Sequence, residues 1–569
     1  MSRSPVGGTH ARRRRRNGPA GGVLLLLLAL LAAACRGAGP SIAPAPALVA
    51  SLRTEPRSFN RYLARDLTTE VITFLTQSPL VKVDRITQQL VPELAESWQL
   101  LPDQITYRVK LRTGVRFSDG EPFSADDVLF SFRAMYAPGS VLINRLSVMG
   151  QPLVAQAEDP ATVTIRFPTP YGPGLRILDG VPMLPRHRLE ASPADGTFRS
   201  HWGPATPPSE LAGTGPFVLR SYVPGQRLTF DRNPHDWRSA QTRPANRLVL
   251  EVMADQDAEA VALQSGRIDF TQSEIRPSDY AALKRDEGEG RVALTDLGVG
   301  LDGDMLWFNL TPRAADAKRR WLQQAEFRRA VSHAIDRTAF VNTVFLGAGA
   351  PAYSIVSPGN TTWHVATPEA GFDPATTNQI LDRLGLVDRD NGSFRHDANG
   401  SPATFTLLTQ SGNTALERGA AFIRTALQAV GIEVNVVPLE VNALVARFTK
   451  GDYDAVYFRL LTTDTDPSLN LDFWLSSGSA HVWNAEQRTP AAEWEKQTDG
   501  LIRQMTVTTD QDRRHVLFAD VQLIWARELP ALCFAFPRVW VAVNTRVRGA
   551  TPALARPTVL WNSAALAVK

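Results

Sequence analysis

A predicted strand runs through a turn into a predicted helix in the segment Leu111-Arg-Thr-Gly-Val-Arg-Phe-Ser-Asp-Gly-Glu-Pro-Phe-Ser-Ala-Asp-Asp-Val128. The residues from Thr106 to Arg112 alternate in side-chain character with the period of two that is typical of a strand, and Gly114 marks the turn that ends it. Ser124 and Asp127 form a capping-box pattern, which predicts that a helix begins there. The segment therefore indicates mixed helix and sheet.

The rest of the chain continues this mixture in both directions. Beyond about Met305 the predicted helices become longer and alternate with strands, which indicates α/β layering. No internal repeat is visible. We expect strands at Ala47 to Leu52, Thr162 to Phe167, Phe217 to Tyr222, Arg227 to Phe230, Leu248 to Val252, Ile432 to Val437 and Tyr453 to Leu460, and helices at Ala258 to Gln264, Phe327 to Ile335, Ala415 to Ala429 and Ala443 to Phe448.

Length and composition indicate a large folded protein. The chain has 569 residues, of which 44% are hydrophobic and 21% are charged, and this length predicts two or three packed units. The net charge of +4 comes from 61 basic and 57 acidic residues. Six of the basic residues are arginines before position 35, so the remainder carries 55 basic and 57 acidic residues. This balance offers no support for nucleic-acid binding.

The N-terminal segment has the features of an export signal. Arg12 to Arg16 are followed by an apolar run from Val23 to Ala34, which is too short to cross a bilayer. Small residues precede Cys35, so we predict a signal peptide over 1–34 and a lipid-anchored tether over 35–46, with an ordinary secretory signal as the alternative. The chain has one other cysteine, Cys533, which we expect to be a buried apolar side chain.

Local motifs for catalysis, metal binding and nucleotide binding are absent from the sequence. It contains no His-Glu-x-x-His, no Gly-x-Ser-x-Gly, no P-loop and no pair of Cys-x-x-Cys motifs. The nine histidines are scattered without an i, i+4 pair, so we predict no metal site and no cofactor. Gly213-Thr-Gly215 lacks the third glycine of a dinucleotide motif, and we interpret it as backbone freedom at a chain reversal before Pro216.

Several ordered blocks of the chain resemble extracytoplasmic solute-binding proteins of the oligopeptide, dipeptide and nickel family, family 5, which are the receptors of ABC importers. The resemblance covers essentially all of the chain after the leader. The blocks are Pro92-Glu-Leu-Ala-Glu-Ser-Trp98, Thr106-Tyr107, Leu111 to Val128, Leu184-Pro-Arg-His187, Gly213-Thr-Gly-Pro-Phe217, Asn233-Pro-His-Asp-Trp237, Leu263 to Asp269, Trp307-Phe-Asn-Leu310, Phe327 to Arg337 and Gly451-Asp-Tyr-Asp-Ala455.

The resemblance implies an α/β, two-lobed fold like that of the periplasmic binding proteins, with an extra N-terminal subdomain. Lobe one would comprise residues 47–75, 204–298 and 541–569, the inserted subdomain 76–203, and lobe two 299–540. Crossover strands near Leu301 to Met305 and Val539 to Asn544 would form the hinge. A ligand would stabilise the closed state by its higher affinity for that state.

Lobe two contains the segment where peptide-binding relatives hold the ligand's α-ammonium. In those relatives a carboxylate stands four residues before a proline; here the segment reads Leu461-Thr-Thr-Asp-Thr-Asp-Pro467, which puts Thr463 at that position. Asp464 is one place off, and Asp466 adjoins Pro467. On a strand both aspartates would face one side and meet a cation; equally, they would form an Asx-type turn.

Other candidate ligand-binding residues come from both predicted lobes. Glu55, Ser58 and Phe59 lie in the loop that matches the family's first-lobe cleft loop, with an exposed turn as the alternative. In lobe two, Arg459 would receive a ligand carboxylate, Trp307 would line the cleft or pack beneath it, and Trp474 and Trp483 would stack on the ligand. Cys35 is the predicted lipidation site, and no catalytic residue is assigned.

These features lead to one main hypothesis and two alternatives. The main hypothesis is a monomeric, non-enzymatic receptor, lipid-anchored in the periplasm or on the outer face of the cell membrane, that delivers a peptide or similar small solute to an ABC permease. One alternative is an exported hydrolase that uses Asp464, Asp466 or Glu55 as acid and base. The other is a solute sensor without transport. Sugars and metal chelates stay open as ligands because Thr463 departs from the family pattern.

Overall fold

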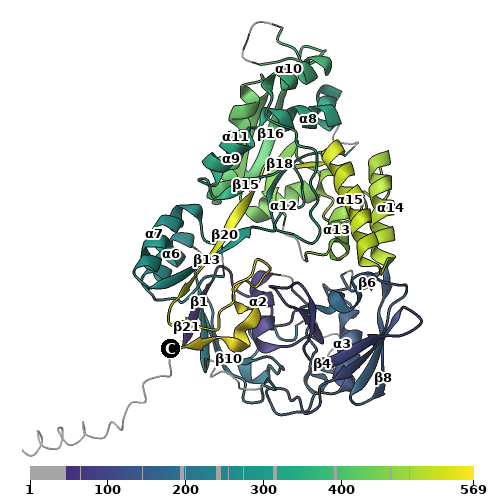
Figure 1. The fold of residues 1–569 in the computed structure, drawn as a ribbon, viewed down its shortest axis with the longest axis vertical. Coiled ribbons are helices and arrows are strands. Elements are labelled where there is room, and N and C mark those ends of the chain that lie inside the picture. Colours follow the sequence, from purple (N-terminus) through teal and green to yellow (C-terminus); the bar gives the residue numbers. More distant parts are fainter. Residues whose placement is uncertain are drawn as a thin grey trace, which may run out of the picture. The chain divides into compact units, whose positions relative to one another are not determined.

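The computed structural model describes residues 47–569, except for 65, 144, 192–197, 199, 239–244, 254, 273, 312–316, 390–391, 393, 461–463 and 486. The predicted signal peptide, Cys35 and the tether lie outside the described residues, as does Thr463. Figure 1 shows the course of the chain, and the strands group into separate sheets along it.

The first sheet combines the N-terminal strand with strands that follow 160 or more positions later. The order is β1-β12-β11-β10, in which β1 pairs with β12 in parallel and the other pairs are antiparallel. Helix α2 packs against β10. All four strands were predicted from the sequence. The elements are β1 Leu48–Leu52, α2 Leu67–Thr76, β10 Phe217–Val223, β11 Arg227–Arg232 and β12 Arg247–Val252.

The second sheet is antiparallel, in the order β4-β5-β9-β8, and lies entirely between residues 95 and 166. Helix α3 covers it and begins with the predicted capping box, in which the Asp127 side chain accepts from the Ser124 amide at 2.9 Å. One continuous apolar core joins this sheet to the first. The elements are β4 Ala95–Leu100, β5 Thr106–Leu111, β8 Val154–Asp159, β9 Thr162–Arg166, α3 Ala125–Met135, η1 Gly174–Leu178 and α4 Arg186–Leu189.

The largest sheet has five strands in the order β17-β16-β18-β14-β19. β16 pairs in parallel with β17 and β18, whereas β14 runs antiparallel to β18 and β19. All five residues of β14 are buried, as expected of a strand covered on both faces. The strands are β14 Asp304–Phe308, β16 Thr404–Gln410, β17 Glu433–Leu439, β18 Ala455–Arg459 and β19 Ala531–Cys533.

Helices cover both faces of this sheet and build two separate cores. Leu306 and Phe308 of β14 point into one core, and Met305 and Trp307 point into the other. This confirms the predicted α/β layering. The first core is built from α8 Ala325–Ala334, α9 Arg337–Val344, α10 Pro374–Arg383 and α11 Thr414–Gln428, and the second from α12 Val441–Thr449, α13 Leu471–Trp474, α14 Glu493–Val507 and α15 Gln511–Glu528.

A long strand, β20, runs between the five-stranded sheet and the two four-stranded sheets that share a core (Figure 1). We call these the two groups of sheets. Its first residues pair with β15 beside the five-stranded sheet, and the stretch from Arg538 to Asn544 pairs with β13. The tip of this stretch bridges to Phe270 and through it to β1. The elements here are β13 Val292–Val299, β15 Gly349–Pro351, β20 Ala535–Asn544, α6 Gln256–Gln264 and α7 Tyr280–Gly288.

The remaining described elements are short. They join the sheets described above or lie at the C-terminal end of the chain. They are β2 Val81–Val83, β3 Leu90–Pro92, β6 Ser147–Val148, β7 Gln151–Pro152, η3 Pro208–Glu210, η4 Pro277–Asp279, η6 Ala317–Gln323, η7 Pro467–Leu469, η8 Val482–Asn484, β21 Val547–Arg548, η9 Leu560–Ala565 and β22 Ala567–Val568.

The glycines of the Gly213-Thr-Gly215 segment have a different role from the predicted one. Neither has a φ in the left-handed region. A Cβ at either position would instead collide with the backbone of Thr76 at the end of α2. Close approach of two backbone segments is therefore the reason for glycine here, and the interpretation as conformational freedom was wrong.

Cys533 is buried in the second core of the five-stranded sheet, as predicted. Burial, together with the nearby Asp304 carboxylate, raises the pKa of its thiol to about 12. The thiol is therefore protonated at neutral pH.

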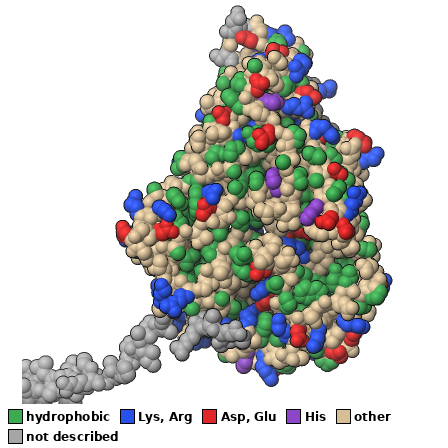
Figure 2. All heavy atoms as spheres, in the orientation of Figure 1, with side chains coloured by type: hydrophobic (Ala, Val, Ile, Leu, Met, Phe, Trp, Pro, Cys, Tyr) green, Lys and Arg blue, Asp and Glu red, His purple; other side chains and the backbone are tan. Residues whose placement is uncertain are grey.

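At the surface, basic and acidic side chains intermingle over the face that Figure 2 displays.

Candidate functional site

The segment from Asp464 to Asn470 leaves β18 and begins with a pair of Asx-type turns. The Asp464 carboxylate accepts a hydrogen bond from the Asp466 amide at 2.8 Å, and the Asp466 carboxylate accepts one from the Ser468 amide at 2.9 Å. Asp466 thereby caps η7. Both aspartates therefore form the Asx-type turns that were one of the two alternatives, and contact of either carboxylate with a ligand stays a prediction. Their second partners, however, lie in different parts of the chain.

Asp466 is paired within the five-stranded part of the molecule. Its two carboxylate oxygens accept from Nη2 of Arg514 on α15, at 2.7 and 2.8 Å. Both residues are buried, Arg514 with 1% of its surface exposed and Asp466 with 5%. The guanidinium also lies over the ring of Trp363 and donates to Ser468. This pair fixes the segment to α15.

Asp464 is paired with an arginine that precedes it by 288 residues. Nε of Arg176, in η1, donates to its carboxylate at 2.9 Å, and the side chains of Asp464 and Arg176 are 7% and 14% exposed. Burial raises the pKa of the Asp464 carboxyl, and the Arg176 charge only partly offsets this. The other guanidinium nitrogens donate to the Gln88 carbonyl, the Gln88 side chain and Thr465.

A second buried ion pair lies behind the first. Arg85 and Asp179 meet at 2.8 Å, each with a side chain 8% exposed, and Asp179 also accepts from the Val83 amide. Burial opposes the charge on Arg85, but the carboxylate of Asp179 outweighs it and raises the arginine's pKa. Each buried charge beside the Arg176–Asp464 pair therefore has a partner of opposite sign, as burial of a charge requires.

The two parts of the chain also meet through main-chain atoms and through close packing. The Gly172 amide donates to the carbonyl of Thr506 on α14 at 2.8 Å. A Cβ on Gly172 would stand 2.5 Å from both Arg514 Nε and the Thr508 carbonyl oxygen, so only glycine fits there. Leu469 packs against the core of the first two sheets.

Arg459, predicted to receive a ligand carboxylate, already holds two carboxylates. Its Nε donates to Asp304 at 2.7 Å, and its Nη1 donates to Glu274 at 3.1 Å. Burial alone would lower the pKa of Arg459, but Asp304 and then Glu274 raise it above its ordinary value. The Asp304 side chain is 2% exposed, whereas that of Glu274 is 55% exposed. Glu274 is therefore the more weakly held of the two carboxylates.

The first-lobe loop residues are held by the structure around them. Glu55 is exposed and accepts from the Tyr222 hydroxyl at 3.0 Å and from the Gly225 amide. The buried Ser58 hydroxyl donates to the Trp202 carbonyl, and Phe59 packs in the first core, edge-on to Tyr222. These contacts explain the loop conformation, and contact of these residues with a ligand stays a prediction.

The three predicted tryptophans lie in the second core of the five-stranded sheet. Trp307 and Trp483 are fully buried, and Trp474 is 7% exposed. Trp474 and Trp483 both contact the rings of Phe473 and Trp525. In this structure these rings pack against one another, and a role in stacking on a ligand stays a prediction.

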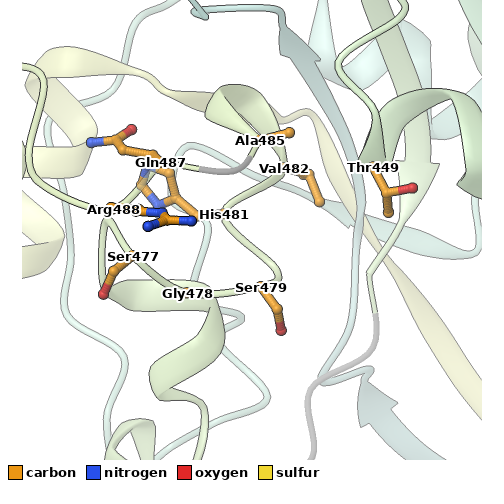
Figure 3. Close-up of a pocket in the computed structure, with 9 residues that line it drawn as sticks. All are labelled: Thr449, Ser477, Gly478, Ser479, His481, Val482, Ala485, Gln487 and Arg488. Carbon is orange, nitrogen blue, oxygen red and sulfur yellow. The ribbon is translucent and has the colours of Figure 1, made fainter.

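A pocket of about 660 Å³ lies elsewhere, along the loop that ends at η8 (Figure 3). Near the pocket, the Tyr453 hydroxyl donates to the Val482 carbonyl, and the Leu310 amide donates to the Trp483 carbonyl. These bonds place the pocket near the end of β14 and β18 where Phe308 pairs with Ala455. Asp304 and Arg459 pair at the opposite end of these two strands. The pocket is lined by Thr449, Ser477, Gly478, Ser479, His481, Val482, Ala485, Gln487 and Arg488.

Sequence reasoning missed Gln88, Arg176, Glu274 and Asp304. Each belongs to a segment without a chemical motif, and Arg176 and Asp464 meet only because the fold joins distant segments. Among the residues that the structure describes, no group of three or more His, Cys, Asp or Glu side chains is arranged to hold a metal ion. No helix in the described part of the chain is long and apolar enough to cross a membrane.

Comparison with known proteins gives a consistent result. The model of the bacterial extracellular solute-binding proteins, family 5 (middle), matches residues 89–481. A putative ABC transporter peptide-binding protein of Brucella ovis is 30% identical over 421 residues, which cover 71% of this chain and 72% of that protein.

Solved structures share the fold. The oligopeptide-binding protein AppA of Bacillus subtilis, in complex with a nonapeptide, has a TM-score of 0.73 at 23% identity and covers 92% of this chain and 99% of its own. NikA of Brucella suis, in complex with Fe(III)-EDTA, has a TM-score of 0.76 at 22% identity and covers 92% and 100%. The fold thus accommodates ligands of unlike chemistry.

Proposed function

Because this chain belongs to family 5 of the bacterial extracellular solute-binding proteins, we propose that it binds a peptide or similar small solute between two lobes and delivers it to an ABC permease. The α/β, two-lobed fold of the relatives agrees with the separate groups of sheets in this chain. The lobes would be residues 47–75, 204–298 and 541–569, with the subdomain 76–203, against residues 299–540.

The observation that carries the proposal is a set of charged contacts between these two sides. Arg459 binds Asp304 on its own side and Glu274 on the other, and Asp464 binds Arg176 across the same boundary. A solute bound between the lobes would meet charged groups that already pair across the boundary. β20, which pairs with β13 at one end and with β15 at the other, is the physical connection about which the lobes would move.

We expect the solute's carboxylate to replace Glu274 on Arg459. Glu274 is largely exposed, and water can solvate its carboxylate once it is released, so breaking its pair with Arg459 costs little free energy. A guanidinium binds a carboxylate with directional hydrogen bonds, and Asp304 keeps Arg459 in place. The main chain of a peptide would add hydrogen bonds in the manner of an extra strand.

Titration of the purified protein with a tetrapeptide and with its C-terminally amidated form tests this proposal. A solute that binds only the folded state stabilises it by RT ln(1 + [L]/Kd), so the unfolding temperature should rise with the free acid. We expect the amidated form and the Arg459→Met variant to bind about tenfold more weakly or worse, since each lacks one partner of the charge pair. Absence of binding by any of a broad set of peptides would refute the peptide assignment.

We also propose that acylated Cys35 anchors the mature protein to a membrane outside the cytoplasm. The support is the small-residue pattern before Cys35 and the extracytoplasmic character of the family. Acyl chains bind membranes by burying methylene groups, and two or more chains give stable anchoring. Metabolic labelling with radioactive palmitate should label the wild type and leave Cys35→Ala unlabelled. A soluble, unlabelled wild-type protein would contradict the anchor.

A further inference from the structure

Arg176 belongs to the inserted subdomain, yet its side chain is committed to the segment that follows β18. We infer that Arg176 is the internal counter-ion of Asp464, so that the closed protein offers no unpaired carboxylate to the ammonium group of a solute and favours solutes without a free amino terminus at this position. The inference rests on the proposed function for its ligand and deepens it by naming the class of solute.

The guanidinium of Arg176 is held on every side that the structure describes. Nε donates to Asp464 at 2.9 Å, Nη1 to the Gln88 carbonyl at 2.7 Å, and Nη2 to the Gln88 side chain at 3.1 Å and to Thr465 at 3.0 Å. The Thr465 hydroxyl donates in turn to Gln88 Oε1 at 2.9 Å. These bonds hold the charge in one orientation, which makes the pairing with Asp464 specific.

The charges around this contact are already balanced. Arg85 pairs with Asp179, and Arg514 pairs with Asp466. With Arg176 on Asp464, each of these three carboxylates has its own cation. An ammonium group that approached Asp464 would bring an excess positive charge into a site where the side chains are 14% exposed or less, and burial makes such a charge costly.

Replacement of Arg176 by the solute is also unfavourable. The displaced guanidinium would lose its bonds to Gln88 and Thr465 as well as its bond to Asp464, whereas Glu274 on Arg459 would be released into water. The two ion pairs between the lobes therefore differ: the pair at Arg459 is built to exchange its partner, and the pair at Asp464 is built to persist. A solute carboxylate is accepted and a solute ammonium is not.

The pair also favours closure of the lobes. Arg176 and Asp464 meet only when the subdomain touches lobe two, the same arrangement in which the Gly172 amide bonds to Thr506. A higher population of the binding-competent state improves the apparent affinity of any solute. Loss of the Arg176 charge should thus have two consequences: easier opening, and a new preference for free amino termini.

The decisive experiment compares tetra-alanine with N-acetyl-tetra-alanine by isothermal titration calorimetry. Wild-type protein should bind N-acetyl-tetra-alanine about tenfold or more tightly than tetra-alanine, because the ammonium group of tetra-alanine finds no unpaired carboxylate there. Arg176→Met, which keeps the length of the side chain, should prefer the free amine by about tenfold or more, because Asp464 is then unpaired. The double variant Arg176→Met with Asp464→Asn should lose this preference. Arg108→Met, which breaks an exposed pair with Glu158, is the matched control and should behave as wild type.

Hydrogen–deuterium exchange without solute separates this inference from the proposed function. The segment that contains Gly172 should exchange several-fold faster in Arg176→Met than in wild type or Arg108→Met, because opening exposes its amide. If no peptide of the broad set binds while this difference in exchange is seen, peptide binding is refuted and the counter-ion role is supported. Wild-type protein that binds tetra-alanine as tightly as its N-acetyl form or more tightly, or equal exchange in Arg176→Met and wild type, would overturn the inference.

Discussion

Asp464 and Asp466 stand two residues apart, the side chain of each is 7% exposed, and each is paired with one arginine, yet the two pairs have different roles. Asp466 binds Arg514 of α15, whose apolar residues pack in the second core of the five-stranded sheet. Asp464 binds Arg176 of η1, whose apolar residues pack in the core of the first two sheets, so under the proposed lobe arrangement this pair exists only while the two lobes touch. Residue type, burial and local sequence are nearly the same. The difference lies in where the partner is attached, and it separates an interaction that stabilises the fold from one that stabilises a conformation.

The largest expected effect is at Asp466. The Asp466→Asn variant leaves the Arg514 guanidinium buried beside a neutral amide, and removal of one member of a buried pair costs about 3–5 kcal/mol. Urea unfolding followed by tryptophan fluorescence measures this loss of stability. The exposed Glu158→Gln variant is the control, because loss of its pair with Arg108 should change the free energy of unfolding by less than about 1 kcal/mol. A loss below about 1 kcal/mol for Asp466→Asn would contradict the structural role of this pair.

Two glycines give a smaller, parallel contrast. A Cβ at Gly215 meets the backbone between Thr76 and Gln77, so Gly215→Ala should cost about 1–3 kcal/mol of stability. A Cβ at Gly172 meets Arg514 and Thr508, which under the proposed lobe arrangement lie across a boundary that can open. Gly172→Ala should therefore change unfolding by less than about 1 kcal/mol.

Hydrogen–deuterium exchange tests whether a substitution at Gly172 opens the contact around residue 172. We expect Gly172→Ala to accelerate deuterium uptake in the segment around residue 172, whereas Gly288→Ala, which meets no atom within 4 Å, should leave both exchange and stability near wild type. Equal losses of stability in Gly172→Ala and Gly215→Ala would show that the lobe boundary is as rigid as the interior of a lobe.

Asp464→Asn should have a still smaller effect on unfolding. Under the proposed lobe arrangement, loss of this pair lets the lobes separate and water reach Arg176, so we expect a loss of less than about 1 kcal/mol. Measured in the same urea series as Asp466→Asn, it provides the direct test of the contrast between the two aspartates. A loss equal to that of Asp466→Asn would show that the boundary contact is part of the fold.

The smallest effect concerns Cys533. Because burial raises the pKa of its thiol to about 12, the folded protein should show no rise in alkylation of Cys533 by iodoacetamide between pH 7 and 10. In urea the thiol should titrate near its ordinary value, and alkylation should rise over that interval. Mass spectrometry of the peptide that contains Cys533 distinguishes it from Cys35. Alkylation of the folded protein that rises near pH 8.5 would contradict the burial.

The sequence predicted the elements far better than the site. The strand from Thr106, the capping box at Ser124 and the alternation of helices with strands after Met305 were confirmed, because each depends on residues only a few positions apart. The long helices α14 and α15 were not predicted. The three candidate tryptophans lie in an apolar core. The sequence could not indicate this, because an aromatic ring that packs in a core and one that binds a ligand have the same local sequence features.

By itself, the sequence determined the family, the order of the elements and the presence of charged residues after β18, because each of these depends on residues that lie close together in the chain. Tertiary structure alone decided that Asp466 pairs with Arg514 of α15, that Asp464 pairs with Arg176 of η1, and that Arg459 meets Glu274. The physical reason is the range of the interactions. Hydrophobic periodicity and capping act within a few residues, whereas a buried charge takes whichever partner the fold brings near it, here one 288 residues away.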